Sequence, residues 1–272
     1  MGQLLLRAKA AAQHAIQLDD SLGEAHASLA EALEREWDFN GAEREFMRAL
    51  ELNPGYATGH QWYGEFLSGM NRMDEALEQY KLAMKLDPLS PVIHMEAALP
   101  YRYRGQYDES LRRLRDALKI DPSFATTHGQ LAYTLSDAGD QEAALLEFQQ
   151  AVKGGIGEAP WIKTGIAIAY ARSGNKRQAR LYLARLIAMD RRSHLLGMHV
   201  AAVFVALGEN DQAIDWIQRA YRLHEWELCW IAVAPALVPL RGDPRVQELV
   251  RSMGLPPSAT AAWNLPNHSA KL

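Results

Sequence analysis

Four histidines at regular spacing are the first residues of this chain that could do chemistry. His26, His60, His94 and His128 follow one another at intervals of 34 residues. Histidine nitrogens bind transition metals and transfer protons near neutral pH. However, residues spaced in this way belong to successive repeats, and neighbouring helices lie roughly 8 to 10 Å apart. The rings should therefore form a ladder and not converge at the ~2.0 to 2.1 Å that zinc requires. We interpret them as half-buried packing residues and predict no metal site.

Other catalytic patterns are weak. Cys229 has His224 nearby in sequence but lacks a supporting triad pattern, and the chain contains no GxSxG, no HExxH, no CxxC and no glycine-rich phosphate loop. The glutamates Glu31, Glu34 and Glu65 are interpreted as a solvated helix face and not as a general acid pair. We therefore predict a protein that is not an enzyme and that carries no cofactor.

The elements that must position these side chains recur at the same interval. Pro54, Pro88 and Pro122 are each 34 residues apart. Small residues stand 12 and five residues before these prolines, where two helices must come close: Ala42, Ala76, Ser110, Ala49, Ala83 and Ala117. Glycines recur in the turns and suit a helix end that needs a left-handed residue: Gly105, Gly139, Gly174 and Gly208. Each repeat is predicted to be two helices joined by a turn, and no strand pattern appears.

Composition agrees with one elongated array. The chain has 272 residues, a net charge of -4 with both signs interspersed, and a single cysteine. Without a basic field, nucleic-acid binding by this segment is not expected. No apolar run approaches membrane length, and the opening residues do not resemble a signal peptide. We expect a soluble, cytoplasmic protein.

The repeats resemble the tetratricopeptide repeat family, whose unit is a 34-residue helix-turn-helix. In the second repeat, HQWYGEFL supplies Tyr63, Gly64 and Leu67 at the family's spacing, and Ala76 and Tyr80 follow in the second helix. The resemblance covers about residues 3 to 227. It implies an all-α fold, a right-handed superhelical solenoid of antiparallel helix pairs.

Repeat boundaries follow from this alignment. We predict a half repeat over residues 1–22 with a second helix only, six repeats over 23–227, a capping segment over 228–256 and a disordered tail over 257–272. Pro100 stands inside a predicted first helix and should bend or break it. An extra residue in GGIGEAP predicts an irregularity around Gly154 to Pro160. The half repeat favours a sequence cut from a longer protein.

The closing segment carries a second resemblance. WELCWIAVAPALVPLRGDPRVQELVRSMGLP is similar to the end of repeat arrays at the carboxyl terminus of bacterial winged-helix regulators, protein kinases and nucleotide cyclases. Asp243 is a predicted N-cap, Pro244 the first helical residue and Gly254 a stop. The helix between them should cover the apolar face of the last repeat.

The tetratricopeptide resemblance also implies a binding groove along the concave side of the first helices. The groove positions that we assign to a partner are Gln61, Trp62, Glu65, Met95, Glu96, Leu99, Gln130, Tyr133 and Trp161. Trp62, Met95, Leu99 and Tyr133 would be apolar anchors, although Trp62 and Met95 could equally fill space between repeats. The family members that clamp a terminal carboxylate use Lys and Asn here, whereas this chain has Ala27, Glu31 and Trp62. That departure points to an apolar or basic partner.

From the sequence we therefore expect a non-catalytic protein-interaction scaffold, the regulatory part of a bacterial signalling or transcription-regulating protein. One alternative is an accessory domain of a larger enzyme such as a kinase, cyclase or glycosyltransferase. Another is self-association through the unpaired helix at about Leu4 to Leu18.

Overall fold

The structure is a computed structural model, and it describes residues 2–193 and 195–264. These residues form helices joined by short turns, and no strand occurs among them. In chain order the α-helices are α1 (Gly2–Leu18), α2 (Gly23–Arg35), α3 (Phe39–Leu52), α4 (Ala57–Gly69), α5 (Met73–Leu86), α6 (Pro91–Glu96), α7 (Leu99–Tyr103), α8 (Tyr107–Ile120), α9 (Ala125–Asp137), α10 (Gln141–Ala151), α11 (Pro160–Arg172), α12 (Lys176–Ser193), α13 (Gly197–Leu207), α14 (Asn210–Arg222), α15 (Pro244–Ser252) and α16 (Pro257–Thr260). Shorter helical turns are η1 (Val152–Ile156), η2 (Trp226–Ala232), η3 (Pro235–Leu240) and η4 (Ala261–Asn264).

Helix α3 shows how the repeated sequence makes a repeated element. It begins at the N-cap Asp38, whose carboxylate accepts a hydrogen bond from the Gly41 backbone N–H, which satisfies one of the unpaired donors of the first turn. Its inward stripe includes Ala42, Phe46 and Ala49, each with no exposed surface. The helix ends just before Pro54, because proline disfavours helical geometry in the preceding residue.

The turn between the two helices of a repeat uses a left-handed residue, as the sequence predicts. The expected glycines Gly105, Gly139, Gly174 and Gly208 have φ of 73°, 99°, 83° and 83°. The first two repeats place Trp37 (φ 64°) and Asn71 (φ 60°) at the same turn position. A left-handed tryptophan is strained, so other contacts must hold Trp37 in place.

Two predicted irregularities are present. The first helix of the third repeat is broken into α6 and α7, with Pro100 near the start of α7, because proline cannot supply the backbone hydrogen bond of a helix interior. The residues after α10 form the wide turn η1, in which Gly155 has φ 93°. This turn absorbs the extra residue of GGIGEAP.

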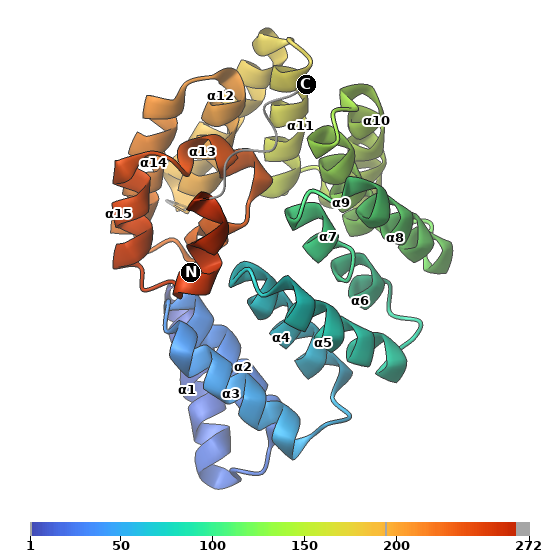
Figure 1. Ribbon diagram of the computed structural model, residues 1–272, viewed down its shortest axis with the longest axis vertical. Coiled ribbons are helices and arrows are strands. Elements are labelled where there is room, and N and C mark those ends of the chain that lie inside the picture. The colour runs from blue at the N-terminus through green and yellow to red at the C-terminus, as the bar shows by residue number, and fades with distance from the viewer. Residues whose placement is uncertain (1, 194, 265–272) are drawn as a thin grey trace.

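The successive helix pairs curve into a ring (Figure 1), so the last elements lie beside the first repeats. Turn η2 packs against both α2 and α4. The largest apolar core accordingly joins buried residues of α3 to α5, such as Phe46 and Phe66, with buried residues of the closing elements, such as Leu228 and Ile231. An open solenoid has contacts between neighbouring repeats only, whereas this chain also has contacts between its two ends.

The C-terminal segments pack on the end of the array. Helix α15 begins at the predicted N-cap Asp243 and buries Val246, Leu249 and Val250. The tail expected to be disordered from residue 257 is helical in α16 and η4, where Ala259 is fully buried; the expectation is therefore wrong for residues 257–264, because this segment packs back on the core. Residues 265–272 lie outside the described residues.

Candidate binding site inside the ring

The closing segment supplies the inner wall of the ring. Trp226 and Trp230 lie in η2, and the guanidinium of Arg35 stands 4.9 Å from the centre of the Trp226 ring. Trp230 lies 5.9 Å from the ring of Tyr103, and its side chain passes 3.8 Å from the position that a Cβ of Gly69 would occupy. Segments nearly 200 residues apart in sequence thus meet at the concave side of the first helices.

Two adjoining cavities remain between this wall and the first helices. One has a volume of about 270 Å³ and the other about 420 Å³. Both are lined by Tyr103, Gln130, Trp161, Trp226, Glu227 and Trp230. They are therefore two parts of one interior space, which we call the central cavity.

Most of the groove residues predicted from the sequence line the central cavity. Those that do are Glu65, Met95, Glu96, Leu99, Gln130, Tyr133 and Trp161. Gln61 and Trp62 line neither part; Trp62 is half-buried and packs against the largest core. Met95 is only 4% exposed and also belongs to the apolar core of the third and fourth repeats.

Tyr133 and Trp161 form a fixed side of the cavity. The Tyr133 hydroxyl donates a 2.5 Å hydrogen bond to the Trp161 carbonyl oxygen, and the two rings stack with centroids 6.2 Å apart. The guanidinium of Arg102 lies 4.8 Å from the Tyr133 ring centre. Burial raises the pKa of the Tyr133 hydroxyl, so this group remains a donor.

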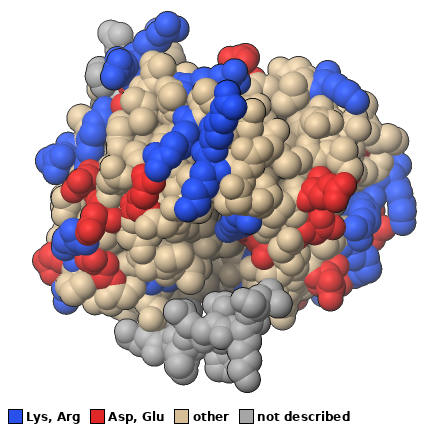
Figure 2. All heavy atoms as spheres, turned by 90° about the horizontal axis from the view of Figure 1, so that it is seen from above, with Lys and Arg blue, Asp and Glu red and all other residues tan. Residues whose placement is uncertain are grey.

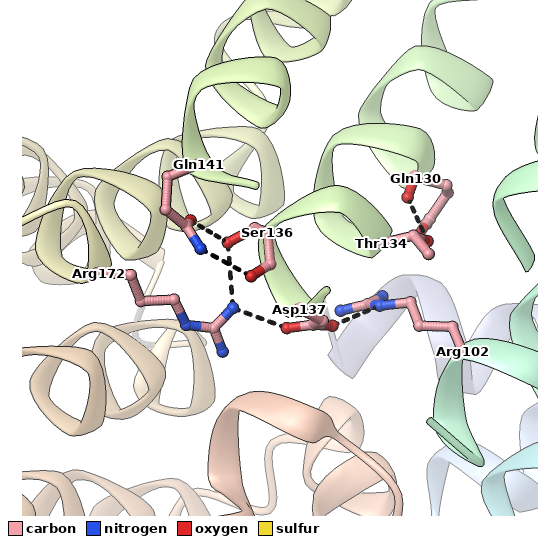
Figure 3. Close-up of polar contacts among 7 residues, drawn as sticks. All are labelled: Arg102, Gln130, Thr134, Ser136, Asp137, Gln141 and Arg172. Carbon is pink, nitrogen blue, oxygen red and sulfur yellow. Dashed lines mark hydrogen bonds and ion pairs between the residues drawn. The ribbon is translucent and has the colours of Figure 1, made fainter. Parts of the chain in front are cut away.

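A polar network behind this wall joins three repeats (Figure 3). Arg102 Nε donates to Asp137 Oδ2 at 2.7 Å, and Arg172 Nη1 donates to Asp137 Oδ1 at 2.8 Å. Arg172 also donates to the Ser136 hydroxyl, which in turn donates to Gln141 Oε1 at 2.7 Å. The Asp137 carboxylate is only 3% exposed. This network fixes α7, α9 and α11 relative to one another.

Three buried or half-buried carboxyl groups lie on α2, α4 and α6. The sequence prediction of a solvated face is wrong for Glu34, which is 6% exposed, because the closing segment covers α2. Burial raises the pKa of Glu34 well above its ordinary value, and the neighbouring Glu31 and Glu65 raise it further. Burial together with Glu31 raises the pKa of Glu65 to about 7, against the opposing effect of Arg35. The pKa of Glu96 is likewise raised well above normal, mainly by burial.

The histidine ladder has a structural role at the junctions between repeats. The Nε2 atoms of His26, His60, His94 and His128 lie 3.1, 3.0, 3.0 and 3.1 Å from the carbonyl oxygen six residues earlier in the chain. In three of these residues Nδ1 faces a side-chain oxygen of the following helix, such as Gln79 for His60 at 2.7 Å. Lys163 takes the same position in the fifth repeat and donates to the Gly157 carbonyl oxygen at 2.9 Å. Each side chain thus ties an inter-repeat turn to the helix pair that follows it.

The other candidate for chemistry is Cys229. Its thiol is fully buried, and burial together with Glu34 and Glu65 raises its pKa well above normal, which keeps the thiol protonated and weakly nucleophilic. His224 is engaged elsewhere, since it stacks on Trp37 and its Nε2 lies 3.2 Å from the Glu36 carbonyl oxygen. Within residues 2–193 and 195–264, no group of three or more His, Cys, Asp or Glu side chains could hold a metal ion. The described helices also include none that is long and apolar enough to span a bilayer.

Family models match most of the ring. Two models, both described as tetratricopeptide repeat, match residues 57–88 and residues 95–159 and 164–225. The chain belongs to the tetratricopeptide repeat family. None of the curated proteins compared with it matches significantly. The family supports a scaffold for protein interactions.

Solved structures agree with this fold. A human IFIT1 dimer with PPP-AAAA is 19% identical, with a TM-score of 0.65 over 93% of this chain and 62% of that one. The type IV pilus biogenesis factor PilW is 23% identical, with a TM-score of 0.58 over 69% of this chain and 86% of that one. The Cut9–Hcn1 hetero-tetramer of the APC/C is 11% identical, with a TM-score of 0.64 over 92% and 46%. The tetratricopeptide chain thus spans less than two thirds of the IFIT1 chain, and these identities establish the fold alone.

The sequence did not predict the part of the site that comes from the end of the array. Trp226, Glu227 and Trp230 line both parts of the central cavity, yet the first two were assigned to the end of the sixth repeat and Trp230 to the capping segment. Two tryptophans and a glutamate within WELCW were a usable signal, because aromatic residues are enriched at binding surfaces. What the sequence could not show was that the array curves far enough for this segment to face the first helices.

Proposed function

We propose that this tetratricopeptide array is a non-catalytic interaction scaffold that binds a segment of a partner protein at the central cavity. The observation that carries the proposal is the joint lining of this cavity by seven predicted groove residues and by the closing segment. Aromatic side chains such as Tyr133 and Trp161 are held in fixed positions there, and such rigid anchors contribute strongly to binding energy. A preorganised cavity also lowers the entropic cost of association.

The surrounding surface favours a protein partner over nucleic acid. Basic and acidic side chains both lie on the face shown in Figure 2, and the net charge of the chain is -4. Phosphate backbones are held by clusters of Lys and Arg. The oligonucleotide in the IFIT1 structure is therefore not taken as a guide to the ligand of this chain.

The wider role that we propose is regulatory. The closing segment resembles the end of arrays in bacterial winged-helix regulators, kinases and cyclases, and in this structure the same segment forms the inner wall of the site. A partner that binds the central cavity would contact both the repeats and this segment. Such contact would link binding of the partner to the position of the closing segment relative to the repeats.

Selection of peptides tests the proposed function. A phage-displayed library of 12-residue peptides is selected on the full chain, and enriched peptides are titrated by fluorescence anisotropy. The variant Leu99→Ala with Gln130→Ala alters two half-buried lining residues and should weaken binding at least about tenfold, the equivalent of 1.4 kcal/mol. The matched control is Trp62→Ala, a predicted groove residue that lines neither part of the cavity. Peptides that bind the double variant unchanged, or that depend on Trp62 instead, would refute the assignment.

A second candidate function, self-association, is favoured by one observation on α1. Leu4 and Leu18 are 68% and 75% exposed, and their spacing of 14 residues places them on the same side of α1, which packs on α2 with another face. A second copy could cover this apolar side. Sedimentation velocity across a range of concentrations tests the idea, with Leu4→Glu and Leu18→Glu as the disrupting pair. A monomeric mass at every concentration would exclude it.

A further inference from the structure

The larger part of the central cavity has an unusual balance of charge. Three carboxyl groups line it: Glu65, Glu96 and Glu227. Among the described residues that line it there is no lysine or arginine. Arg35, whose positive charge lowers the pKa of Glu65, is paired with Glu31 at 3.0 Å and is not a lining residue. Three acids thus share a volume of about 420 Å³ without a resident cation.

One acid in particular has an unsatisfied carboxyl oxygen. Glu96 Oε2 is buried and makes no hydrogen bond within the described structure. An unsatisfied buried acceptor is costly and needs an explanation, such as a bound proton or an absent ligand. Burial and the neighbouring Glu65 raise the pKa of Glu96, while a hydrogen bond from Gln61 opposes the shift. The raised pKa values of Glu65 and Glu96 thus favour the protonated forms of both carboxyl groups.

The remaining walls are aromatic. Tyr103, Trp161, Trp226 and Trp230 line the same volume, and ring faces attract organic cations. The ring interior already uses this interaction twice, with Arg35 over Trp226 at 4.9 Å and Arg102 over Tyr133 at 4.8 Å. The carboxyl groups are also too dispersed to form a metal site, since no described group of three could hold an ion. An extended cation with an apolar body fits this combination better than a metal.

We propose that the larger part of the central cavity binds an alkylammonium group, with Glu65 and Glu96 as its countercharges and the aromatic walls around its carbon chain. This inference rests on the proposed function, because it names the chemistry of the group that the scaffold recognises. The group can come from a lysine side chain of a partner protein or from a free aliphatic amine. Glu227 contributes less, since it already pairs with His199 at 2.9 Å.

Binding should displace protons from the site. An ammonium group stabilises the ionised forms of both carboxyl groups, so Glu65, with its pKa of about 7, gives up its proton as the cation enters. Below that pH the cation must compete with the proton. From pH 6 to pH 8 the affinity should therefore rise about tenfold if one such proton is released.

Isothermal titration calorimetry on the full chain tests the proposal. The probes are putrescine, as a free amine, and Nα-acetyl-lysine methylamide, as a lysine side chain; 1-butanol is the uncharged control. We expect at least one amine to bind, about tenfold more tightly at pH 8 than at pH 6, with proton release detected in buffers of different ionisation enthalpy. Stronger binding by the lysine derivative would assign the site to a partner's side chain, and stronger binding by putrescine would assign it to a free amine.

Isosteric variants separate a binding role from a structural one. Glu65→Gln and Glu96→Gln should each reduce amine affinity at least about tenfold while retaining the folded state, because neither removes a buried ion pair. Glu142→Gln, on the exposed side of α10, is the matched control and should bind like the parent.

Two results would overturn the inference: no heat of binding with either amine at pH 8, or equal affinity in both Gln variants and the parent. Selected peptides without basic residues that still depend on Leu99 and Gln130 would show that the scaffold function stands without an ammonium site. If no peptide is selected and the amines still bind, the scaffold proposal fails while the ammonium site remains.

Discussion

Small packing residues and buried glutamates both shape this molecule. The sequence predicted the role of the small residues but not the burial of the glutamates. Small residues at fixed spacing, such as Ala49 and Ala83, were found from the repeat alone and have no exposed surface. The interior acids Glu34 and Glu65 looked like ordinary surface charges, because a helical position that faces solvent in one repeat looks the same in sequence as one that faces a distant segment. Their environment is set by η2, which lies more than 150 residues away. Periodicity carries no information about that contact.

Replacement of Ala49 by leucine should destabilise the fold. The side chain has no exposed surface, so a larger one must push apart the helices of the first repeats. The expected loss is about 1 to 3 kcal/mol from overpacking, measured as a lowered urea midpoint with an unchanged m-value. Ala10→Leu in the exposed part of α1 is the matched control. An unchanged midpoint for Ala49→Leu would mean that the helices are not packed as described.

The interior acids should make stability depend on pH. The Glu65 carboxyl has a pKa of about 7 in the folded chain, against an ordinary value of 4.5, so the folded state holds the proton more tightly. Its contribution to stability is complete below about pH 4.5 and is lost as the pH rises through about 7. The neighbouring Glu31 raises the pKa of Glu65 and Arg35 lowers it, while burial and Glu65 raise the pKa of Glu96.

We therefore expect the melting temperature to fall between pH 5 and pH 8, and Glu65→Gln to recover roughly 2 to 4 °C at pH 8 for each ~1 kcal/mol of relieved cost. Differential scanning calorimetry at both pH values measures the effect, with Glu142→Gln as control. A variant that melts below the parent at pH 8 would show that the ionised carboxylate has a favourable partner.

At the scale of elements, the positions of glycine and proline in the sequence predicted most helix ends. Gly105 and Gly139 marked turns, and the break at Pro100 and the wide turn at Gly155 were predicted from one proline and one inserted residue. The sequence did not predict the side-chain contact that the break between α6 and α7 allows. With α6 and α7 separated, Arg102 lies buried beside α9 and reaches Asp137 at 2.7 Å. A polar link between repeats depends on side chains that the family pattern does not specify.

Loss of the Asp137 carboxylate should uncouple three helices. Arg102 is only 7% exposed, so Asp137→Asn leaves a buried guanidinium without its countercharge. Breaking a buried pair in this way costs about 3 to 5 kcal/mol, and the cost is measured by urea unfolding. The double variant Asp137→Asn with Arg102→Met removes both charges and should recover part of the loss. If the double variant is less stable than Asp137→Asn alone, the buried charge is not the cause.

At the scale of the whole molecule, the sequence repeat predicts a helical array but not the contact between its two ends. Each repeat contacts its neighbours, and the curvature that brings the ends together accumulates from small rotations that no single repeat reveals. The structure closes where the first turn meets the end of the sixth repeat: Trp37 stacks on His224 with centroids 3.7 Å apart and on Tyr221 of α14 at 5.7 Å. Trp37 and His224 both have positive φ, 64° and 52°, so strain is accepted at both sides of this contact.

The variant Trp37→Gly tests closure without disturbing the turn, since glycine occupies the same position in later repeats and adopts a left-handed conformation freely. Loss of the stacked side chain, partly offset by relief of backbone strain, should cost about 2 kcal/mol. Hydrogen exchange should then accelerate in η2 and in α4 together, because both lose the fixed geometry of the ring. Asn71→Gly is the matched control, since it alters the same turn position of the second repeat and removes one hydrogen bond of 3.4 Å to the Ser258 carbonyl oxygen. Exchange that accelerates around residue 37 alone would mean that the ends of the array associate independently of this contact, and that the central cavity does not depend on it.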